Sequence, residues 1–431
     1  MKSNRIVKNA GWIIGARVVQ TILSFVIGML TARFLGPSNY GLINYAASVV
    51  AFLTPVMELG ITNIIVHQLV EHKTKEGDTL GTALVLNSAS AMFCIIIIVL
   101  FSMITNVGET ETIVVCALYS ALLLFKAVEV LQYWFQAHLF SKYSSIASLT
   151  AYIVVSAYKV FLLVTHKSVY WFAVSYAIDN CVIAVLLWTL YKKLGGQKLS
   201  FSKETAKRLF SQGKYYIVSS MMVTIFAQTD RIMLKAMLGA ESVGYYSAAV
   251  TCAGMTGFIV TAIIDSFRPV IFEGKKKSED VFNNHLVSLY SIIIYFSLAQ
   301  SLVMTIGARI IVMIVYGNQY IPSINVLRIV VWYTTFAYLG SVRNIWLLAE
   351  NKQKYLWKIN LFGAIANVVL NYALIPVFGV NGAAIASLVT QFFTNVIVGY
   401  IIRPITFNNS LMIKGLNPKA LKGVVGRIIT K

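Results

Sequence analysis

Apolar stretches of about 20 residues recur along the whole chain and are separated by short polar clusters. A helix of that length is what crosses the roughly 30 Å hydrocarbon core of a bilayer. The polar clusters are rich in Gly, Pro, Asn and Ser, which favour turns. The pattern predicts twelve membrane-spanning helices in an all-α polytopic membrane protein. Their expected ranges are 10–34, 41–66, 80–104, 112–137, 145–165, 169–190, 215–238, 243–270, 286–306, 323–349, 356–376 and 380–402.

The composition agrees with this fold class. Of the 431 residues, 58% are hydrophobic and 12% are charged, whereas soluble domains carry about 25% charged residues. The four cysteines lie inside apolar runs without the spacing of a metal or redox site, so we expect no metal and no cofactor. They are Cys94, Cys116, Cys181 and Cys252.

Basic residues are distributed unequally between the two sides of the predicted bundle. Alternate loops, together with both termini, carry 25 of the 36 Lys and Arg residues, and the opposite loops carry only Lys167 and Arg309. Loops rich in Lys and Arg stay in the cytoplasm. Both termini are therefore expected there, and the net charge of +20 is an orientation signal that also suits anionic lipid. We expect no nucleic-acid partner.

Two short motifs occur twice. LGPSNYG at 35–41 corresponds to LGAESVG at 238–244, 203 positions later, and WFQA at 134–137 corresponds to WLLA at 346–349. Two halves of six spans each would enter the membrane from the same side and be related by an axis along its normal. We expect an N-terminal lobe at 1–194, a basic cytoplasmic linker at 195–214, a C-terminal lobe at 215–403 and a basic tail at 404–431.

Several predicted spans contain charged residues. Such charges are costly in hydrocarbon and usually face a bundle interior or a wet cavity. Lys126, Glu129, Tyr133 and Gln136 share one face of a helix, and similar polar stripes occur on spans one, seven, eleven and twelve. We interpret the deep cations as the lining of a central cationic cavity that binds an anionic head group. They are Arg17, Lys126, Lys159, Arg231 and Arg343.

An alternative interpretation treats these charges as structural pairs between or along helices, Lys126 with Glu129 and Arg231 with a neighbouring acid. Residues near span ends, such as Arg33, Lys235 and Arg268, can also extend to the interface. Four acids are candidates for binding a coupling H⁺ or Na⁺, namely Glu58, Glu129, Asp179 and Asp230.

Enzyme signatures are missing from the sequence. It contains no GxxxxGK[ST] phosphate-binding loop and no HExxH pair, the motifs of nucleotide hydrolysis and of zinc proteases. The loops opposite the cytoplasm are also short. We therefore expect a transporter with no catalytic residues.

Five segments together resemble the O-antigen and capsule repeat-unit flippases of the multidrug/oligosaccharidyl-lipid/polysaccharide exporter superfamily. The resemblance extends over nearly the whole chain. The segments are ARFLGPSNYG (32–41), FQAHLFSKY (135–143), QTDRIMLKAMLGAESVGYYSAA (228–249), LLAENKQKY (347–355) and NYALIPVFGVNGAAIAS (371–387).

This resemblance implies two six-helix lobes around a cationic cavity with alternating access. It also implies an undecaprenyl-pyrophosphate-linked oligosaccharide as cargo, moved between leaflets of a bacterial inner membrane. Carried over onto this sequence, the family's cavity cations are Arg17, Arg231 and Arg268, with Asp230 at an acidic motif position. A polysaccharide polymerase and a chain-length regulator are the protein partners we expect.

Three alternatives stay open at this point. A cation-coupled multidrug antiporter of the same superfamily would favour an acidic cavity. A peptidoglycan-precursor flippase would usually have two further helices, and a scaffold for a polysaccharide synthesis complex would transport nothing.

Overall fold

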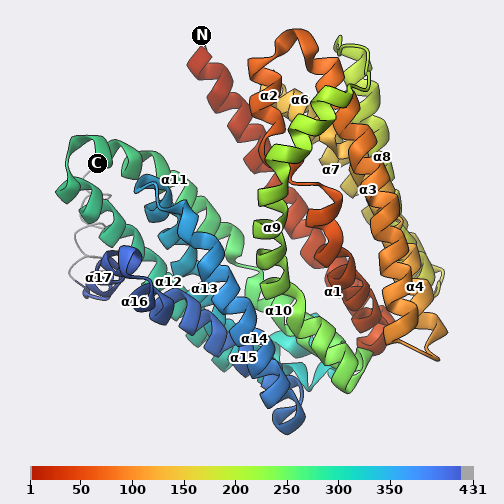
Figure 1. The fold of residues 1–431 in the computed structure, drawn as a ribbon. Coiled ribbons are helices and arrows are strands. Elements are labelled where there is room, and N and C mark those ends of the chain that lie inside the picture. The colour runs from red at the N-terminus through yellow and green to blue at the C-terminus, as the bar shows by residue number, and fades with distance from the viewer. Residues whose placement is uncertain (1, 419–431) are drawn as a thin grey trace. The chain divides into compact units, whose positions relative to one another are not determined.

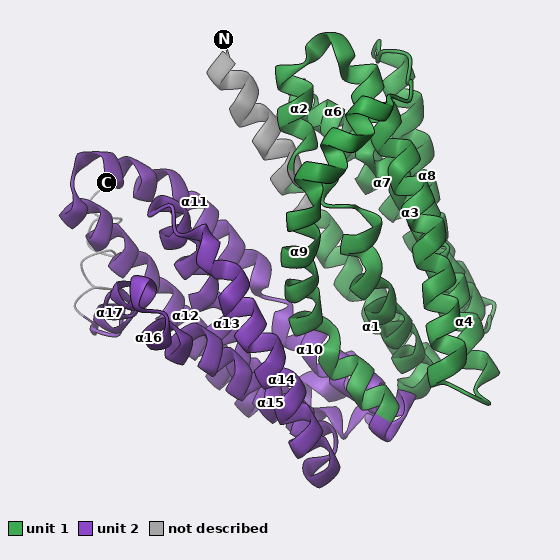
Figure 2. Ribbon diagram, viewed as in Figure 1, with its two compact units in different colours: residues 1–236 green, residues 237–431 purple. Residues whose placement is uncertain are grey.

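A computed structural model gives the backbone of residues 2–418 and the side chains of residues 19–418, that of Asn63 excepted. All regular secondary structure in the described residues is helical (Figure 1). It forms two compact units, residues 1–236 and 237–431 (Figure 2). The division falls near the C-terminal end of α9, whereas the domain boundaries expected from the sequence stay a prediction.

Unit 1 is a bundle in which α1 packs against α3, α4, α7 and α8. Short 3₁₀ turns interrupt the helices, one of them at Ala127–Leu131. The helices are α1 (Lys2–Met57), α2 (Ile65–Glu71), α3 (Glu76–Thr105), α4 (Thr110–Ser120), α5 (Leu122–Lys126), α6 (Gln132–Ala137), α7 (Ser141–Val164), α8 (Val169–Lys193) and α9 (Lys203–Leu238).

Unit 2 is organised around α13, which packs against α10, α12 and α15. A π-helical turn at Phe393–Ile397 separates α15 from α16. The helices are α10 (Ala240–Gly254), α11 (Gly257–Lys277), α12 (Glu279–Val315), α13 (Ser323–Ala349), α14 (Leu356–Phe378), α15 (Val380–Phe392), α16 (Val398–Ile401) and α17 (Thr406–Gly415).

The chain is a multi-pass membrane protein. In the described residues, eight helices are long and apolar enough to cross a membrane, or nine when the bent pair α10–α11 counts as one span. The count is below twelve because α1 covers two expected spans and because α9 and α13 do not meet the same criterion. The number twelve therefore stays a prediction.

The two copies of the LG motif adopt the same backbone conformation. Gly36 has φ 72° and ψ 171° inside α1, and Gly239 has φ 89° and ψ 176° between α9 and α10. Positive φ favours glycine because a Cβ is disfavoured there. Each motif therefore breaks a helix at its glycine, as the sequence repeat indicates.

The second repeated motif also ends in matching turns. Leu139, two residues after α6, has φ 58°, and Asn351, two residues after α13, has φ 53°. The Phe140 N–H donates to the Phe135 carbonyl at 2.6 Å, and the Lys352 N–H donates to the Leu347 carbonyl at 2.8 Å. The internal repeat is thus present in the local backbone of both units.

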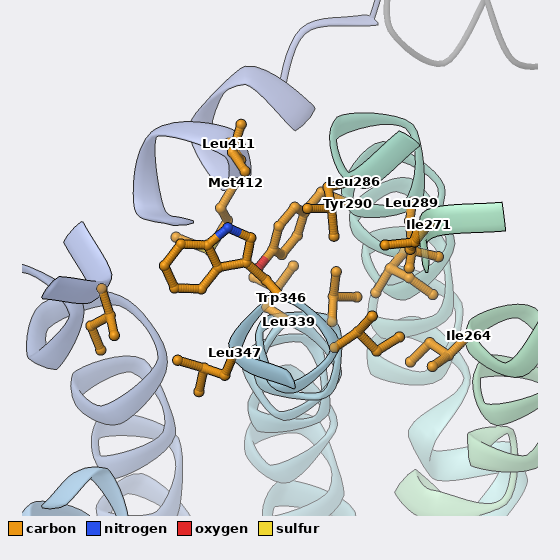
Figure 3. Packing of buried hydrophobic residues seen from close by; sticks show 14 of the residues in the cluster. Ile264, Ile271, Leu286, Leu289, Tyr290, Leu339, Trp346, Leu347, Leu411 and Met412 are labelled. Carbon is orange, nitrogen blue, oxygen red and sulfur yellow. The ribbon is translucent and has the colours of Figure 1, made fainter. Parts of the chain in front are cut away.

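Packing around Trp346 holds unit 2 together (Figure 3). The Trp346 side chain is 1% exposed and lies among residues of α11, α12, α13 and α17, including Tyr290 and Met412. Lipid tails are as apolar as these side chains, so dispersion contacts rather than exclusion of water stabilise such a cluster. The cluster fixes the relative positions of α11 and α13, which border a cleft described below.

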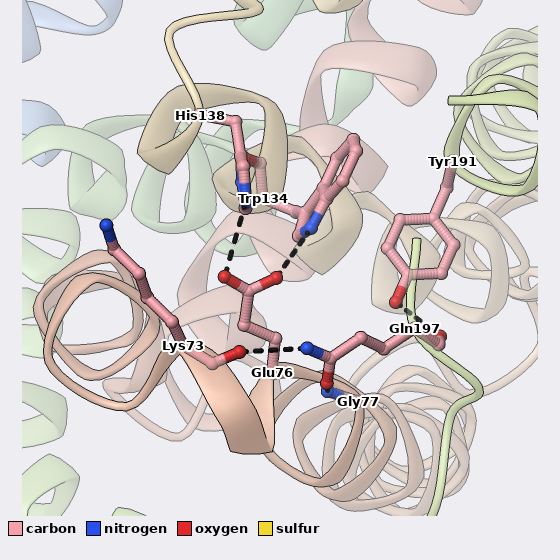
Figure 4. A network of polar contacts seen from close by, with 7 residues as sticks. All are labelled: Lys73, Glu76, Gly77, Trp134, His138, Tyr191 and Gln197. Carbon is pink, nitrogen blue, oxygen red and sulfur yellow. Dashed lines mark hydrogen bonds and ion pairs between the residues drawn. The ribbon is translucent and has the colours of Figure 1, made fainter. Parts of the chain in front are cut away.

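An extended segment between α8 and α9 is fastened to the start of α3 (Figure 4). The Gln197 amide donates to the Lys73 carbonyl at 2.8 Å and accepts from the Gly77 N–H at 3.0 Å. A Cβ at Gly77 would lie 2.3 Å from the Lys198 carbonyl oxygen. Only glycine lets the two backbones approach this closely, and α9 consequently begins at a fixed point of unit 1.

Candidate functional site

A buried charge cluster lies where α5 gives way to a 3₁₀ turn. Lys126 is the last residue of α5, and Glu129 lies one turn further along the chain. The Lys126 Nζ is 3.9 Å from Glu129 Oε2 and 3.7 Å from Glu58 Oε1, just beyond α1. The three side chains are only 18–29% exposed. Lys126 and Glu129 therefore form the ion pair that the sequence spacing allows, and the carboxylate of Glu58 also contacts Lys126.

A second polar group lies between α7 and α8. The Lys159 Nζ is 4.0 Å from the centre of the Tyr176 ring, a cation–π arrangement. Asp179 interacts electrostatically with both Lys159 and Glu129, which links this group to the first cluster. The Asp179 Oδ1 is buried without a hydrogen-bond partner among the described residues.

We call these five residues, Glu58, Lys126, Glu129, Lys159 and Asp179, the unit 1 centre. It brings together two of the expected substrate-binding cations and three of the four expected coupling acids. Three carboxyl groups face two ammonium groups, so the centre is not cationic when all five are ionised. A group of this composition is suited to exchanging H⁺ or a small cation.

A cleft of about 430 Å³ lies beside this centre, between α1 and α9. Glu58 and Gln228 are both among its lining residues. The Gln228 Oε1 accepts from the Arg231 guanidinium at 2.9 Å and from the Ser48 hydroxyl at 3.0 Å. The guanidinium of Arg231 therefore donates to the amide of a residue that lines this cleft.

Lys235, one turn after Arg231, is 4% exposed and contacts Glu109 in the loop between α3 and α4. The hydrogen bond from Lys235, reinforced by one from Thr112, lowers the pKa of Glu109 below its usual range. The ammonium group of Lys235, near the end of α9, is buried against the carboxylate of this half-exposed loop residue, and its extension to the membrane interface stays a prediction. Asp230 is also buried, at 6% exposure.

Arg343 is the most enclosed of the expected cations in unit 2, with 6% of its surface exposed. Its guanidinium donates to the Thr394 carbonyl at 2.8 Å, and its Nε has no hydrogen-bond partner among the described residues. Thr394 lies in the π-helical turn, where backbone hydrogen bonds span five residues instead of the four of an α-helix. In the described part of the chain, no carboxylate forms an ion pair with Arg343.

Arg268, in contrast, is half exposed. Its guanidinium is 3.1 Å from Asp265 on the same helix, and both side chains are about half exposed. The two residues line a cleft of about 520 Å³ between α11 and α13. Arg343 is not among the residues that line this cleft, although its neighbours Ser341 and Asn344 are.

The structure thus brings some of the expected site residues together and separates others. The unit 1 centre contains five of them, whereas Arg268 and Arg343 occupy different places in unit 2. The side chain of Arg17 lies outside the described residues. The convergence of cations from both halves on one space stays a prediction.

Sequence reasoning did not find two features of these sites. Glu109 is an acid in a polar loop, and it contacts Lys235, which lies 126 positions later in the sequence. Tyr338 lines the α11–α13 cleft but stands in the sequence as one aromatic residue among many. No local sequence pattern marks either residue, because tertiary packing alone places Glu109 beside Lys235 and Tyr338 in the cleft.

Comparison with known proteins gives the family. The family model described as "Polysaccharide biosynthesis protein" matches residues 6–275. An uncharacterised membrane protein of Methanocaldococcus jannaschii is 26% identical over 60% of this chain, which spans about half (52%) of that protein. The capsular polysaccharide biosynthesis protein CapF of Staphylococcus aureus is 21% identical, covering 90% of this chain and 96% of CapF. A putative O-antigen transporter of Shigella flexneri is 23% identical, covering 88% and 94%.

Solved structures give the fold. The lipid II flippase MurJ in an inward closed conformation is 13% identical, covers 94% of this chain and 90% of its own, and has a TM-score of 0.73. An inward-facing multidrug resistance MATE transporter of the MOP superfamily is 14% identical, covers 92% and 96%, and has a TM-score of 0.67. These similarities show that the chain shares the fold of these proteins. The family model matches well over half of the sequence, and the chain therefore belongs to the polysaccharide biosynthesis protein family.

Proposed function

We propose that this protein moves undecaprenyl-pyrophosphate-linked oligosaccharide repeat units from the cytoplasmic to the periplasmic leaflet of a bacterial inner membrane, for O-antigen or capsule synthesis. Family membership and the names of the relatives support the class of cargo. The geometric observation that carries the proposal is Arg231, whose guanidinium is held by the amide of Gln228 beside the α1–α9 cleft. Guanidinium groups match the oxygens of phosphate well.

The proposed mechanism is alternating access by twelve spans in two six-helix lobes around a central cavity, with both termini in the cytoplasm. The head group crosses inside the cavity while the lipid tail stays in the bilayer between the lobes. An unpaired charge in hydrocarbon costs several kcal/mol or more, and the cavity spares the pyrophosphate that cost. The proposed contacts to pyrophosphate and sugar are Arg17, Lys126, Lys159, Arg231, Arg268 and Arg343.

Coupling to H⁺ or Na⁺ is part of the proposal. The candidates are Glu58, Glu129, Asp179 and Asp230, the first three within the unit 1 centre. The excess of carboxyl groups there, and the unsatisfied Asp179 oxygen, support an exchangeable cation. Binding of a cation would change the net charge of the centre and thereby favour one conformation over another.

The test is translocation of a fluorescent undecaprenyl-pyrophosphate-linked glycan in proteoliposomes. Arg231→Gln removes the charge but keeps a polar side chain beside Gln228, and we expect a loss of translocation of about tenfold or more. Arg309→Gln, on a residue exposed in unit 2, is the matched control and should transport normally. Normal transport by correctly inserted Arg231→Gln protein would contradict the role proposed for this residue.

One rival function has an observation in its favour. A cation-coupled drug antiporter needs an acidic centre, and the unit 1 centre has more acids than cations. A peptidoglycan-precursor flippase shares the fold without any feature of this chain that favours it. Efflux of a cationic dye from the same proteoliposomes separates the antiporter from the proposed flippase.

A further inference from the structure

The cleft between α11 and α13 has the composition of a site for a polar ligand. Eleven residues line its volume of about 520 Å³, which is within the usual size range of small-molecule sites. Six of them carry polar groups, whereas sites for drug-like molecules are mostly apolar. The six are Thr261, Asp265, Arg268, Tyr338, Ser341 and Asn344.

Three apolar residues of the lining are packed into the interior of unit 2. Val260, Ile264 and Ile345 are 2–6% exposed and belong to the packed cluster around Trp346. The polar residues of the lining are thus carried by helices that are packed into this cluster, which favours pre-organised binding.

One polar atom in this wall lacks a partner. The Tyr338 hydroxyl is buried and makes no hydrogen bond within the described chain. It lies opposite Gly257, because a Cβ built at that glycine would be 3.6 Å from the hydroxyl oxygen. Since a buried hydroxyl without a partner is destabilising, a ligand that reaches this atom would supply a hydrogen bond that the described chain does not make.

The charges of the cleft decide which ligand fits. Asp265 and Arg268 lie 3.1 Å apart and half exposed, so together they contribute no net charge. A pyrophosphate would gain from Arg268 but would be repelled by Asp265. An uncharged polyhydroxyl ligand meets an acceptor in Asp265, donors in Arg268, and both kinds of group in Asn344 and Tyr338.

We propose that this cleft binds a neutral or N-acetylated sugar of the repeat unit, so that Arg268 contacts sugar hydroxyls rather than pyrophosphate. The proposal rests on the proposed function, because the sugar reaches the cleft only as part of a lipid-linked cargo. It assigns the residues Asp265, Arg268, Tyr338 and Asn344 to sugar recognition. Pyrophosphate recognition is left to other cations.

Binding to the purified full-length protein tests this assignment with a panel of probes. The probes are undecaprenyl pyrophosphate alone and the same lipid carrying one galactose, one N-acetylglucosamine or one glucuronic acid. We expect at least one neutral sugar to lower the Kd by about fivefold to tenfold relative to the bare lipid, the gain of one or two hydrogen bonds. Glucuronic acid should gain less, because its carboxylate meets Asp265.

The variants separate the cleft from the rest of the site. Tyr338→Phe combined with Asn344→Ala should remove the gain from the sugar and leave the Kd of the bare lipid unchanged. Tyr372→Phe, on a tyrosine that is 74% exposed in the same unit, is the control and should keep the gain. Tyr338→Phe alone retains the ring and its packing, so the same binding measurement can be made on it if the double variant does not fold.

The outcomes are distinct. A sugar gain that survives in the double variant, or no gain with any sugar of the panel, would overturn the cleft assignment while leaving lipid pyrophosphate binding intact. Failure of the wild-type protein to bind any probe would instead contradict the proposed function itself, and the cleft assignment with it.

Discussion

The two units stabilise buried positive charge in different ways. In unit 1, Lys126 lies near two carboxylates and Lys235 contacts Glu109. In unit 2, the Arg343 guanidinium donates to a backbone carbonyl, and no ion pair accompanies it in the described part of that unit. An ion pair cancels most of its own field, whereas a guanidinium held by a carbonyl keeps a full charge.

This difference bears on what each unit can do. A centre of mixed acids and cations changes its net charge whenever it binds or releases a proton, so it is suited to coupling. A guanidinium is protonated at every accessible pH, so it provides a constant positive potential. Transport of an anionic head group, as proposed, would need both properties. The mixed centre lies in unit 1, and guanidinium groups held by neutral acceptors occur in both units, at Arg231 and at Arg343.

Removing the central ammonium group of the first cluster is expected to have the largest effect on stability. Lys126→Met leaves Glu58 and Glu129 facing each other in a mostly buried place. Breaking a buried pair costs about 3–5 kcal/mol, and we expect the lower end because part of the cluster is exposed. Thermal unfolding in detergent measures the change.

The control and the rescue make this prediction specific. Lys193→Met removes the same charge from an exposed position on α8 and should be nearly neutral. Lys126→Met combined with Glu129→Gln should regain most of the lost stability. Equal stability of Lys126→Met and wild type would show that the three side chains do not interact.

A smaller effect is expected at the Glu109–Lys235 contact, and it depends on pH. The pKa of Glu109 is lowered in the folded protein, so its contribution is present above its unfolded pKa of about 4.3. That contribution is lost as the pH falls through the lowered folded value. Glu109→Gln should therefore destabilise the protein at neutral pH by about 1 kcal/mol, since half of the Glu109 side chain is exposed.

The measurement is the unfolding midpoint as a function of pH, from neutral to below pH 4. The difference between wild type and Glu109→Gln should shrink on the acid side and be constant above about pH 5. Glu111→Gln, on an exposed acid two positions away, should show neither change. A constant difference across the whole range would mean that Lys235 does not stabilise the ionised form of Glu109.

The smallest effect on stability is expected at Arg343. Arg343→Met leaves one carbonyl without a side-chain donor but also removes a desolvated charge, so the two terms nearly cancel. We expect a change within about 1 kcal/mol, together with a large loss of translocation. A loss of stability as large as that of Lys126→Met would show that Arg343 is stabilised by a partner of opposite charge.

Sequence alone predicted the helical membrane fold and the internal repeat, because both leave local patterns. The helix breaks at Gly36 and Gly239 follow from a repeated sequence motif. The contact of Lys126 with Glu129 follows from their spacing of three residues on a helix. The third member of that cluster, Glu58, could not be assigned to it, since only packing of α1 against the rest of unit 1 brings it near. The same holds for Lys235, whose burial depends on a loop far away in sequence.

The helix boundaries show a related limit. The expected span 10–34 and most of the expected span 41–66 fall within α1, and the non-helical backbone of Gly36 marks the kink between its two helical segments. Polar and charged residues lower the mean hydropathy of α9, so it does not meet the criterion for a membrane span. The pattern of polar and apolar positions nevertheless predicted a helix at 215–238. Tyr338 could not be recognised as a cleft residue, since its unsatisfied hydroxyl is a property of packing rather than of spacing.

The most direct test of the account is a side-by-side transport measurement in proteoliposomes that contain the wild-type protein. One set holds a fluorescent undecaprenyl-pyrophosphate-linked glycan in a single leaflet, and the other holds a cationic dye in the lumen. The account predicts translocation of the glycolipid, lost in Arg231→Gln, and no efflux of the dye. Efflux of the dye without translocation of the glycolipid between leaflets would contradict the account.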